Sequence, residues 1–315
     1  MNLRDALMDP NVRTVLWGTT ALGAASGAVG AFTTLRRRAL LGDALSHAAL
    51  PGVCLAYFAF GSKHLGLFMI GALVAGLAGS ACIAALARWT RVRQDAATAL
   101  VLSGFFGLGI VLSRAVQSDS GGSAAGVDGF ILGKAASMTQ ADSLTVGACG
   151  LAVILALLAL ARPLKVAIFD PSFARAQGWP VARLDFALMA MVALTVVAGL
   201  PAVGAVLMVA LLVIPAAAAR LCARRLGAVV ALAMIFGALS GAGGTLVSAL
   251  VPPPDGTYVR GWPTGPLIVV VAAAIFTVVL AVARVRAMTS ARAARLAHTA
   301  HRARLVNSGN EADAP

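Results

Sequence analysis

The sequence predicts an all-α polytopic membrane protein, and three observations lead to this fold class. Apolar residues make up 60% of the 315 residues and charged residues only 12%, and the mean hydropathy of +0.90 is higher than soluble domains show. Apolar runs of about 17 to 23 residues recur, the length that a helix needs to cross a hydrocarbon core of about 30 Å. The alternating pattern of membrane β-strands is absent from the sequence.

Nine apolar stretches are candidates for spanning helices. The first and third contain GTTALGAASGAVGAF and GALVAGLAGS, whose small residues let helix backbones approach closely. The second follows a run of three arginines and contains Pro51-Gly52, which could bend it. The sixth and seventh meet at Leu200 to Gly204, either a tight lumenal turn between short helices or a kink, so the count is eight or nine. In chain order the stretches are 14–34, 42–61, 65–87, 96–116, 143–161, 184–200, 203–219, 227–250 and 266–283.

The basic residues predict the orientation of these spans. If nine spans alternate, 19 of the 25 Lys and Arg residues fall on one side of the membrane and six on the other. Cytoplasmic loops carry an excess of Lys and Arg, so we expect the amino terminus outside and the carboxyl terminus in the cytoplasm. The net charge of +13 is dispersed among short loops at membrane borders. Topology and anionic membrane lipid therefore explain it better than nucleic acid does.

The chain divides into a juxtamembrane segment (1–13), a transmembrane domain (14–284) and a basic cytoplasmic tail (285–315). The tail is rich in Ala and Arg up to Arg304 and could form a helix on the membrane surface. Its His298 and His301 are more typical of solvated side chains than of metal ligands. The four cysteines are scattered, without a CxxC pair, and predict neither a disulfide framework nor a thiolate metal site. The amino terminus lacks the pattern of a cleavable signal, so we expect the first span to be retained.

Asp43 and His47 are the strongest functional signal, because ionisable residues inside a membrane are costly and mark transport or ligand sites. At a spacing of four they share one helix face, and a carboxylate with an imidazole suits divalent zinc, manganese or iron. Counted from Arg38, His47 lies about 13 Å into a helix that rises 1.5 Å per residue. The alternative is a buried structural hydrogen bond within the pair, or from the carboxylate to a neighbouring helix.

Two further polar stretches interrupt the apolar background. The segment IFDPSFARAQGWPVARLD (168–185) predicts a short cytoplasmic helix, capped by Asp170, beginning at Pro171 and ended by Gly178. Spacing alone does not decide whether this helix is a connector or a functional element. In ALLVIPAAAARLCARRLGA, the chain leaves the membrane at Arg220 as a compact basic loop that could dock on a cytoplasmic partner.

Five segments carry a resemblance to a known family: LRRRALLGDALSHAALPGVCLAYF, FDPSFARAQGWPVARLD, AVGAVLMVALLVIPAAAARL, GALSGAGGTLVSAL and PTGPLIVVV. In order and spacing they resemble the membrane permease subunits of bacterial ABC importers for zinc, manganese and iron, the ABC-3 type, over about residues 15–284. The resemblance implies a type II ABC importer-like permease in the bacterial cytoplasmic membrane.

The resemblance also implies partners and roles. A cytoplasmic ATP-binding subunit would drive transport, an extracytoplasmic protein would deliver the metal, and a second permease subunit would complete a homo- or heterodimer. Asp43 and His47 would line the metal pathway. Pro215, Arg220, Arg224 and Arg225 would touch the ATPase. The metal is the cargo, and no permanently bound cofactor is expected.

The sequence agrees that ATP hydrolysis belongs to a partner, since no GxxxxGK[ST] loop is present. The nearest segment, GVDGFILGKAAS, has Asp128 in place of the first Gly and Ala135 after Lys134. We expect the delivery protein to dock on the outer face at Lys63-His64 and the loop 251–265.

Two rival functions remain. A proton-coupled secondary metal transporter would need a relay of several buried carboxylates, but Asp95, Asp142 and Asp185 lie near span ends. An intramembrane hydrolase using Asp43, Ser46 and His47 is disfavoured, because adjacent helical residues point about 100° apart and no polar cluster offers an oxyanion site.

Overall fold

The structure is a computed structural model that describes residues 8–38, 40–61, 65–118, 133, 135, 138–251 and 262–312, with side chains described up to residue 289. Within these ranges the chain is helical and contains no strand. The helices are α2 (Pro10–Leu35), α3 (Leu41–Phe60), α4 (Leu65–Trp89), α5 (Gln94–Ser118), α7 (Gln140–Phe169), α8 (Pro171–Ala176), α9 (Val181–Val203), α10 (Ala205–Cys222), α11 (Leu226–Leu250) and α12 (Thr264–Ala312).

Nine of the described helices are long and apolar enough to cross a membrane, which confirms the predicted all-α fold and the higher of the two span counts. Most predicted ends agree with the helix ends within a few residues. α7 and α12 extend well beyond the predicted ends at 161 and 283. The charged residues that end a hydropathic run, such as Arg162 and Arg284, are good helix formers, so the backbone stays helical past them. The tail is therefore helical to Ala312.

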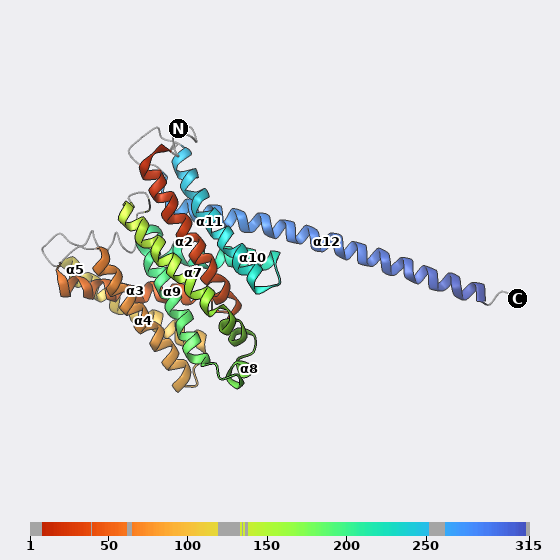
Figure 1. Ribbon diagram of the computed structural model, residues 1–315, viewed down its shortest axis with the longest axis horizontal. Helices are drawn as coiled ribbons and strands as arrows, with labels where there is room; N and C mark the ends of the chain where they lie inside the picture. Colours follow the sequence, from red (N-terminus) through yellow and green to blue (C-terminus); the bar gives the residue numbers. More distant parts are fainter. Residues whose placement is uncertain are drawn as a thin grey trace.

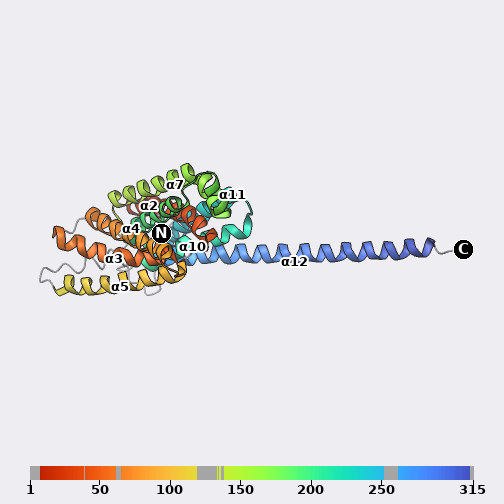
Figure 2. The ribbon, with the colours of Figure 1, turned by 90° about the horizontal axis from the view of Figure 1, so that it is seen from below.

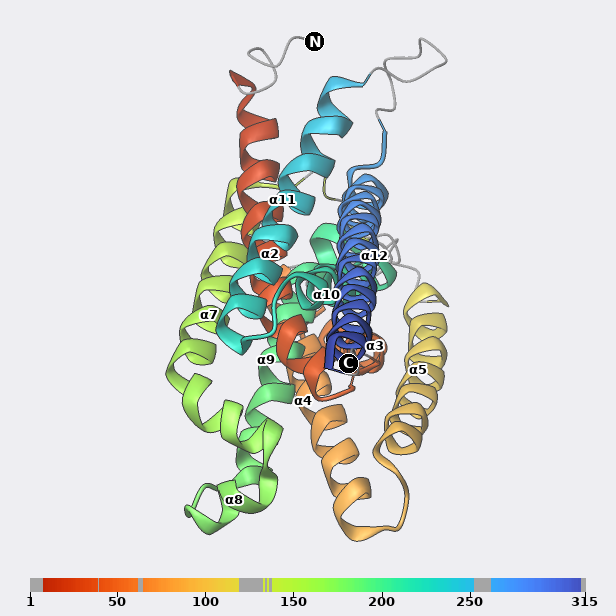
Figure 3. The same ribbon diagram turned by 90° about the vertical axis from the view of Figure 1, so that its right-hand side faces the viewer.

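The helices form two groups joined by α9 (Figures 1 and 3). In one group, α2 is the axis and packs against α7, α10 and α11. In the other, α3 packs against both α4 and α5. α9 contacts members of both groups, and most residues of its apolar, membrane-spanning stretch are buried. α12 packs against α10 and α11 and then projects far from the bundle (Figure 2).

Small residues let the central helices touch through their backbones. A Cβ added at Gly23 of α2 would clash with the carbonyl of Gly237 of α11, and one added at Gly237 would clash with the carbonyl of Gly23. Next to this contact the Thr19 hydroxyl lies 2.9 Å from that of Thr245 and donates to the Gly241 carbonyl at 3.2 Å. In hydrocarbon, such close packing and interhelical hydrogen bonds replace the hydrophobic driving force.

α3 and α10 lie crosswise to the long axes of α2, α4 and α11: both run across Figure 1 and are seen nearly end-on in Figure 3. The two crosswise helices also contact one another, and Leu212 of α10 reaches Gly42 at the start of α3. The depth of 13 Å expected for His47 assumed a helix along the membrane normal. A strongly inclined α3 makes that distance an upper limit.

The break between α9 and α10 lies at Gly204 and is buried inside the bundle. Gly204 has φ +85° and ψ 164°, a conformation essentially restricted to glycine. Val203 and Ala205 on either side are buried, and Gly133 lies against the same peptide. The stretch that the sequence left open is thus a sharp break between two helices, within the protein and not in an exposed loop.

We predict that Gly204→Ala destabilises the protein by about 2 kcal/mol, because any side chain at this φ and ψ is strained. The matched control is Gly147→Ala in α7, where an added Cβ would meet nothing within 4 Å; this change should stabilise the helix by about 0.5 kcal/mol. Reversible unfolding of both variants in mixed detergent and SDS micelles measures the difference. Equal stability of the two variants would contradict the strained geometry.

The turn between α2 and α3 joins α9 through a charge cluster. Arg37 has φ 56°, and the Arg37 and Arg38 amides donate to the carbonyls of Thr34 and Thr33, which makes a Schellman motif with arginine where glycine is usual. The motif aims the Arg36 and Arg38 guanidinium groups at Asp185, with nitrogen–oxygen distances of 2.7 and 3.5 Å.

This cluster is mostly buried, with 10% of the Arg36 side chain and 23% of the Asp185 side chain exposed. Burial lowers the pKa of Arg36, against the opposing effect of Asp185. Nε and Nη2 of Arg36 have no hydrogen-bond partner among the described residues. The carboxylate is therefore the main compensation for two desolvated cations.

Removing Asp185 should be costly, because it leaves two buried charges of the same sign. We predict that Asp185→Ala lowers the free energy of unfolding by about 3 kcal/mol, measured in the same micelle assay. The exposed Asp95→Ala change should shift it by less than about 0.5 kcal/mol. The triple variant Arg36→Met, Arg38→Met, Asp185→Leu should recover part of the stability that Asp185→Ala loses, because no buried charge is left unpaired. If the loss of the triple variant equals the sum of the losses of its three single changes, the three side chains are not coupled.

α8 has the boundaries that the sequence predicts. The Asp170 carboxylate accepts hydrogen bonds from the Phe173 and Ser172 amides at 2.9 and 3.1 Å, and these bonds, with one from the Ser172 hydroxyl, lower the pKa of Asp170. Gly178, with φ +82°, ends the helix. α8 is at the end of the bundle that also contains the α2–α3 turn and the α4–α5 connection, opposite the start of α2 (Figures 1 and 3); we call this the α8 end.

Candidate functional site

Asp43 and His47 come together in the first two turns of α3. Asp43 Oδ1 lies 3.4 Å from His47 Nε2, and 36% of the Asp43 side chain and 27% of the His47 side chain are exposed. That distance is longer than a well-formed hydrogen bond. The pair is therefore neither buried nor tightly closed on itself, and both groups keep lone pairs available to a third partner.

The neighbouring helix α5 holds the imidazole in place. The ring of Phe106 contacts His47 edge-on, with centroids 4.8 Å apart and planes at 75°. α5 packs against α3 along this side. The sequence offered no signal for this contact, because Phe106 is one of many apolar residues in its span.

Pro51 leaves one backbone oxygen of α3 without its usual helical partner. Pro51 lies inside α3, four residues after His47, and proline has no N–H to donate. The carbonyl of His47 consequently lacks its usual helical donor. The space beside Gly52 is filled by α4, because a Cβ at Gly52 would clash with the Gly71 carbonyl. The spacing of Pro51 to His47 is the sequence signal that could have identified this missing helical donor.

Ser46 does not join the pair. Its hydroxyl donates to the Asp43 carbonyl at 2.8 Å, and its side chain is buried. No serine–histidine hydrogen bond therefore supports the hydrolase alternative at this position in the described structure.

By themselves, Asp43 and His47 are too few ligands to hold a metal ion. Among the described residues no group of three or more His, Cys, Asp or Glu side chains could hold a metal ion. Transition-metal ions normally take four or more ligands. Any ion held here would need oxygen from the backbone, water or a second protein.

The residues expected to contact an ATPase lie in and after α10. Pro215 is buried within the helix, Arg220 is exposed in its last turn, and Arg224 and Arg225 form the turn to α11. This turn lies toward the α8 end of the bundle (Figures 1 and 3). Lys63-His64 and most of the loop 251–265, expected to contact a delivery protein, lie outside the described residues.

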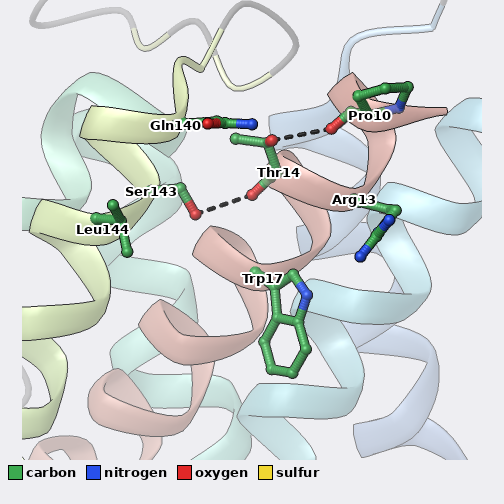
Figure 4. Close-up of a pocket in the computed structure, with 7 residues that line it drawn as sticks. All are labelled: Pro10, Arg13, Thr14, Trp17, Gln140, Ser143 and Leu144. Atoms are coloured by element: carbon green, nitrogen blue, oxygen red, sulfur yellow. Dashed lines mark hydrogen bonds between the residues drawn. The ribbon is translucent and has the colours of Figure 1, made fainter.

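A hollow of about 340 Å³ lies at the opposite end, between the starts of α2 and α7 (Figure 4). The Ser143 hydroxyl donates to the Thr14 carbonyl at 2.9 Å and ties the two helices together there. Arg13 and Trp17 lie on its open side and are exposed. With one charged side chain and no carboxylate, imidazole or thiol in its lining, this hollow is not a metal site.

Comparisons with known proteins agree with this architecture. The chain is 40% identical to the "Manganese transport system membrane protein MntC" of Bacillus subtilis over 270 residues, which cover 86% of this chain and 60% of that protein. It therefore spans less than two thirds of that relative. It is also 40% identical to the "Zinc transport system membrane protein TroC" of Treponema pallidum over 263 residues, 84% of this chain and 86% of that one.

A solved structure and a family model complete the comparison. The complex "PsaBC from Streptococcus pneumoniae in complex with Fab" contains a chain with a TM-score of 0.73 and 30% identity, covering 88% of this chain and 94% of that one. The model of the ABC 3 transport family matches residues 8–283, all the spans but the end of the last helix. The chain therefore belongs to the ABC 3 transport family.

Proposed function

We propose that this chain is the membrane permease subunit of an ATP-driven importer for a divalent transition metal, manganese, zinc or iron, in the bacterial cytoplasmic membrane. Family membership supports the transporter class, and two relatives are named for manganese and zinc transport. The observation that carries the assignment of the pathway is the half-exposed Asp43–His47 pair on α3. ATP hydrolysis belongs to a separate subunit, and the carboxyl terminus faces the cytoplasm.

The pair is suited to weak, transient binding of the ion. The Asp43 carboxylate offsets part of the cost of dehydrating a divalent cation, and the His47 imidazole offers a nitrogen ligand. The His47 carbonyl adds an oxygen that α3 itself does not use. The 3.4 Å gap between the two side chains and the small donor set keep binding weak enough for release.

A second permease subunit supplies what the pair lacks. The pair lies on the α3–α5 side of the bundle, and its exposed fractions show an open face there. Facing a second subunit, two such pairs would provide two carboxylates and two imidazoles around one path. An extracytoplasmic binding protein would deliver the ion at the end opposite α8.

We predict that Asp43→Asn and His47→Gln each lower the rate of radiometal uptake at least about tenfold, because removing even an indirect metal partner commonly costs 10–100-fold in affinity. Uptake of ⁵⁴Mn and ⁶⁵Zn is measured in cells lacking other importers, with equal amounts of each permease in the membrane. Asp95→Asn, at the exposed start of α5, is the charge-matched control and should transport like wild type. Normal uptake by both site variants would refute the assignment.

The ATPase would contact the permease at the α8 end. Arg220 at the end of α10, with Arg224 and Arg225 in the turn that follows, makes this region basic. None of the three lies within ion-pair distance of a carboxylate of the described residues, and Pro215 lies in the helix that ends at the turn. A second candidate is α8, because it lies further toward this end than the α10–α11 turn (Figure 3). Its residues are mostly exposed, and Ala174 is its one buried residue.

Photo-crosslinking separates these two candidates. We predict that a benzophenone side chain placed at Arg224 cross-links to the ATPase subunit and that ATP changes the yield. Position 175 in α8 tests the second candidate in the same assay, and the lipid-facing Leu151 is the negative control. Cross-links from position 175 alone would move the coupling role to α8, and equal yields at Leu151 would contradict both assignments.

A further inference from the structure

A groove of about 390 Å³ runs along the side of the bundle formed by α7, α2 and α11. α7 and α11 each pack mainly against α2 and only slightly, if at all, against each other. The small side chain of Ala28 and the ring of Phe32 form the floor. Leu157 and Met234 line the walls, and Leu158, 66% exposed, lies at the mouth. The groove therefore opens sideways, toward acyl chains.

Two cations stand at one end of this apolar groove. Arg162 and Lys165 lie on α7 three residues apart, and both are exposed. No described carboxylate lies within ion-pair distance of either. They lie close to the α8 end of α7, whereas the rest of the lining on α7 lies toward the membrane interior.

We propose that this groove binds one anionic phospholipid, with an acyl chain along the apolar walls and the phosphate headgroup at Arg162 and Lys165. Ile154 and Lys165, the first and last lining residues on α7, are eleven positions apart, about 16 Å along a helix that rises 1.5 Å per residue. That length matches one leaflet, half of a hydrocarbon core of about 30 Å. Basic pockets between spanning helices are suited to anionic headgroups.

The location supports a lipid as the occupant. The residues that line the groove belong to α2, α7 and α11, and α7 and α11 lie on the other side of the bundle from α5 (Figure 3). The groove therefore does not belong to the Asp43–His47 face. Gly227 lines it, and a Cβ there would meet nothing within 4 Å. An apolar slot with unpaired cations at one end complements an amphiphilic anion better than it complements a soluble one.

The test uses the full chain purified in nonionic detergent and titrated with phosphatidylglycerol, with phosphatidylcholine of the same acyl chains, or with inorganic phosphate. Native mass spectrometry counts bound lipid, and thermal unfolding reports stabilisation. We expect one tightly bound phosphatidylglycerol. The double variant Arg162→Gln, Lys165→Gln should bind it about 30-fold more weakly, since each cation near the surface contributes about 1 kcal/mol.

Two further variants separate a lipid site from general surface charge. Ala231→Trp fills the groove from its exposed rim on α11 and should abolish the tight site although every charge remains. Arg91→Gln, Arg93→Gln removes two exposed cations elsewhere at the α8 end and should leave it intact. Equal binding of phosphatidylcholine, equal stabilisation by phosphate, or unchanged binding in the Ala231→Trp variant would each overturn the proposal.

Discussion

Backbone-to-backbone contact between helices is the constraint on which this bundle depends. Lipid chains are as apolar as leucine, so apolar side chains gain little by leaving lipid for protein. Close approach through glycine gains dispersion and polar contacts that larger residues would forfeit. Gly23 and Gly237 join α2 to α11, and Gly52 and Gly71 join α3 to α4. The first contact fixes the axis of one helix group, and the second fixes the helix that carries the ionisable pair.

α3 combines close helix packing with the proposed metal-pathway residues. Pro51 and Gly52 are poor helix formers, yet both lie in the middle of α3. Gly52 lets α4 approach, while Pro51 withdraws a donor from the carbonyl of His47. Phe106 holds the imidazole from the other side. The two residues that weaken the helix thus have separate effects: Gly52 permits the contact with α4, and Pro51 leaves the His47 carbonyl without its helical donor.

Hydropathy and local sequence patterns predicted much of this fold. The nine spans and the boundaries of α8 follow from hydropathy and from local capping by Asp170 and Gly178, which depend on neighbouring residues only. Tilt does not follow from hydropathy, so the crosswise courses of α3 and α10 were not predictable. The partners of Asp185 and of His47 come from residues distant in sequence. The spacing of Asp43 and His47 placed them on one face, but only the packed bundle shows that the face is half open.

The basic residues at the α8 end differ in whether they are exposed and free of an acidic partner. A count of charges treats them as equal and accounts for orientation. In the folded chain, Arg36 and Arg38 are drawn inward by Asp185 and are largely unavailable to water or lipid. Arg162 and Lys165 lie at one end of an apolar groove, and Arg224 lies in an exposed turn. Asp185 offsets one of the two charges of Arg36 and Arg38, and burial keeps both guanidinium groups from contact with a headgroup or a partner. The exposed cations of this end are therefore the ones that an anion can contact, and those on α7 and after α10 lie at the two proposed binding positions.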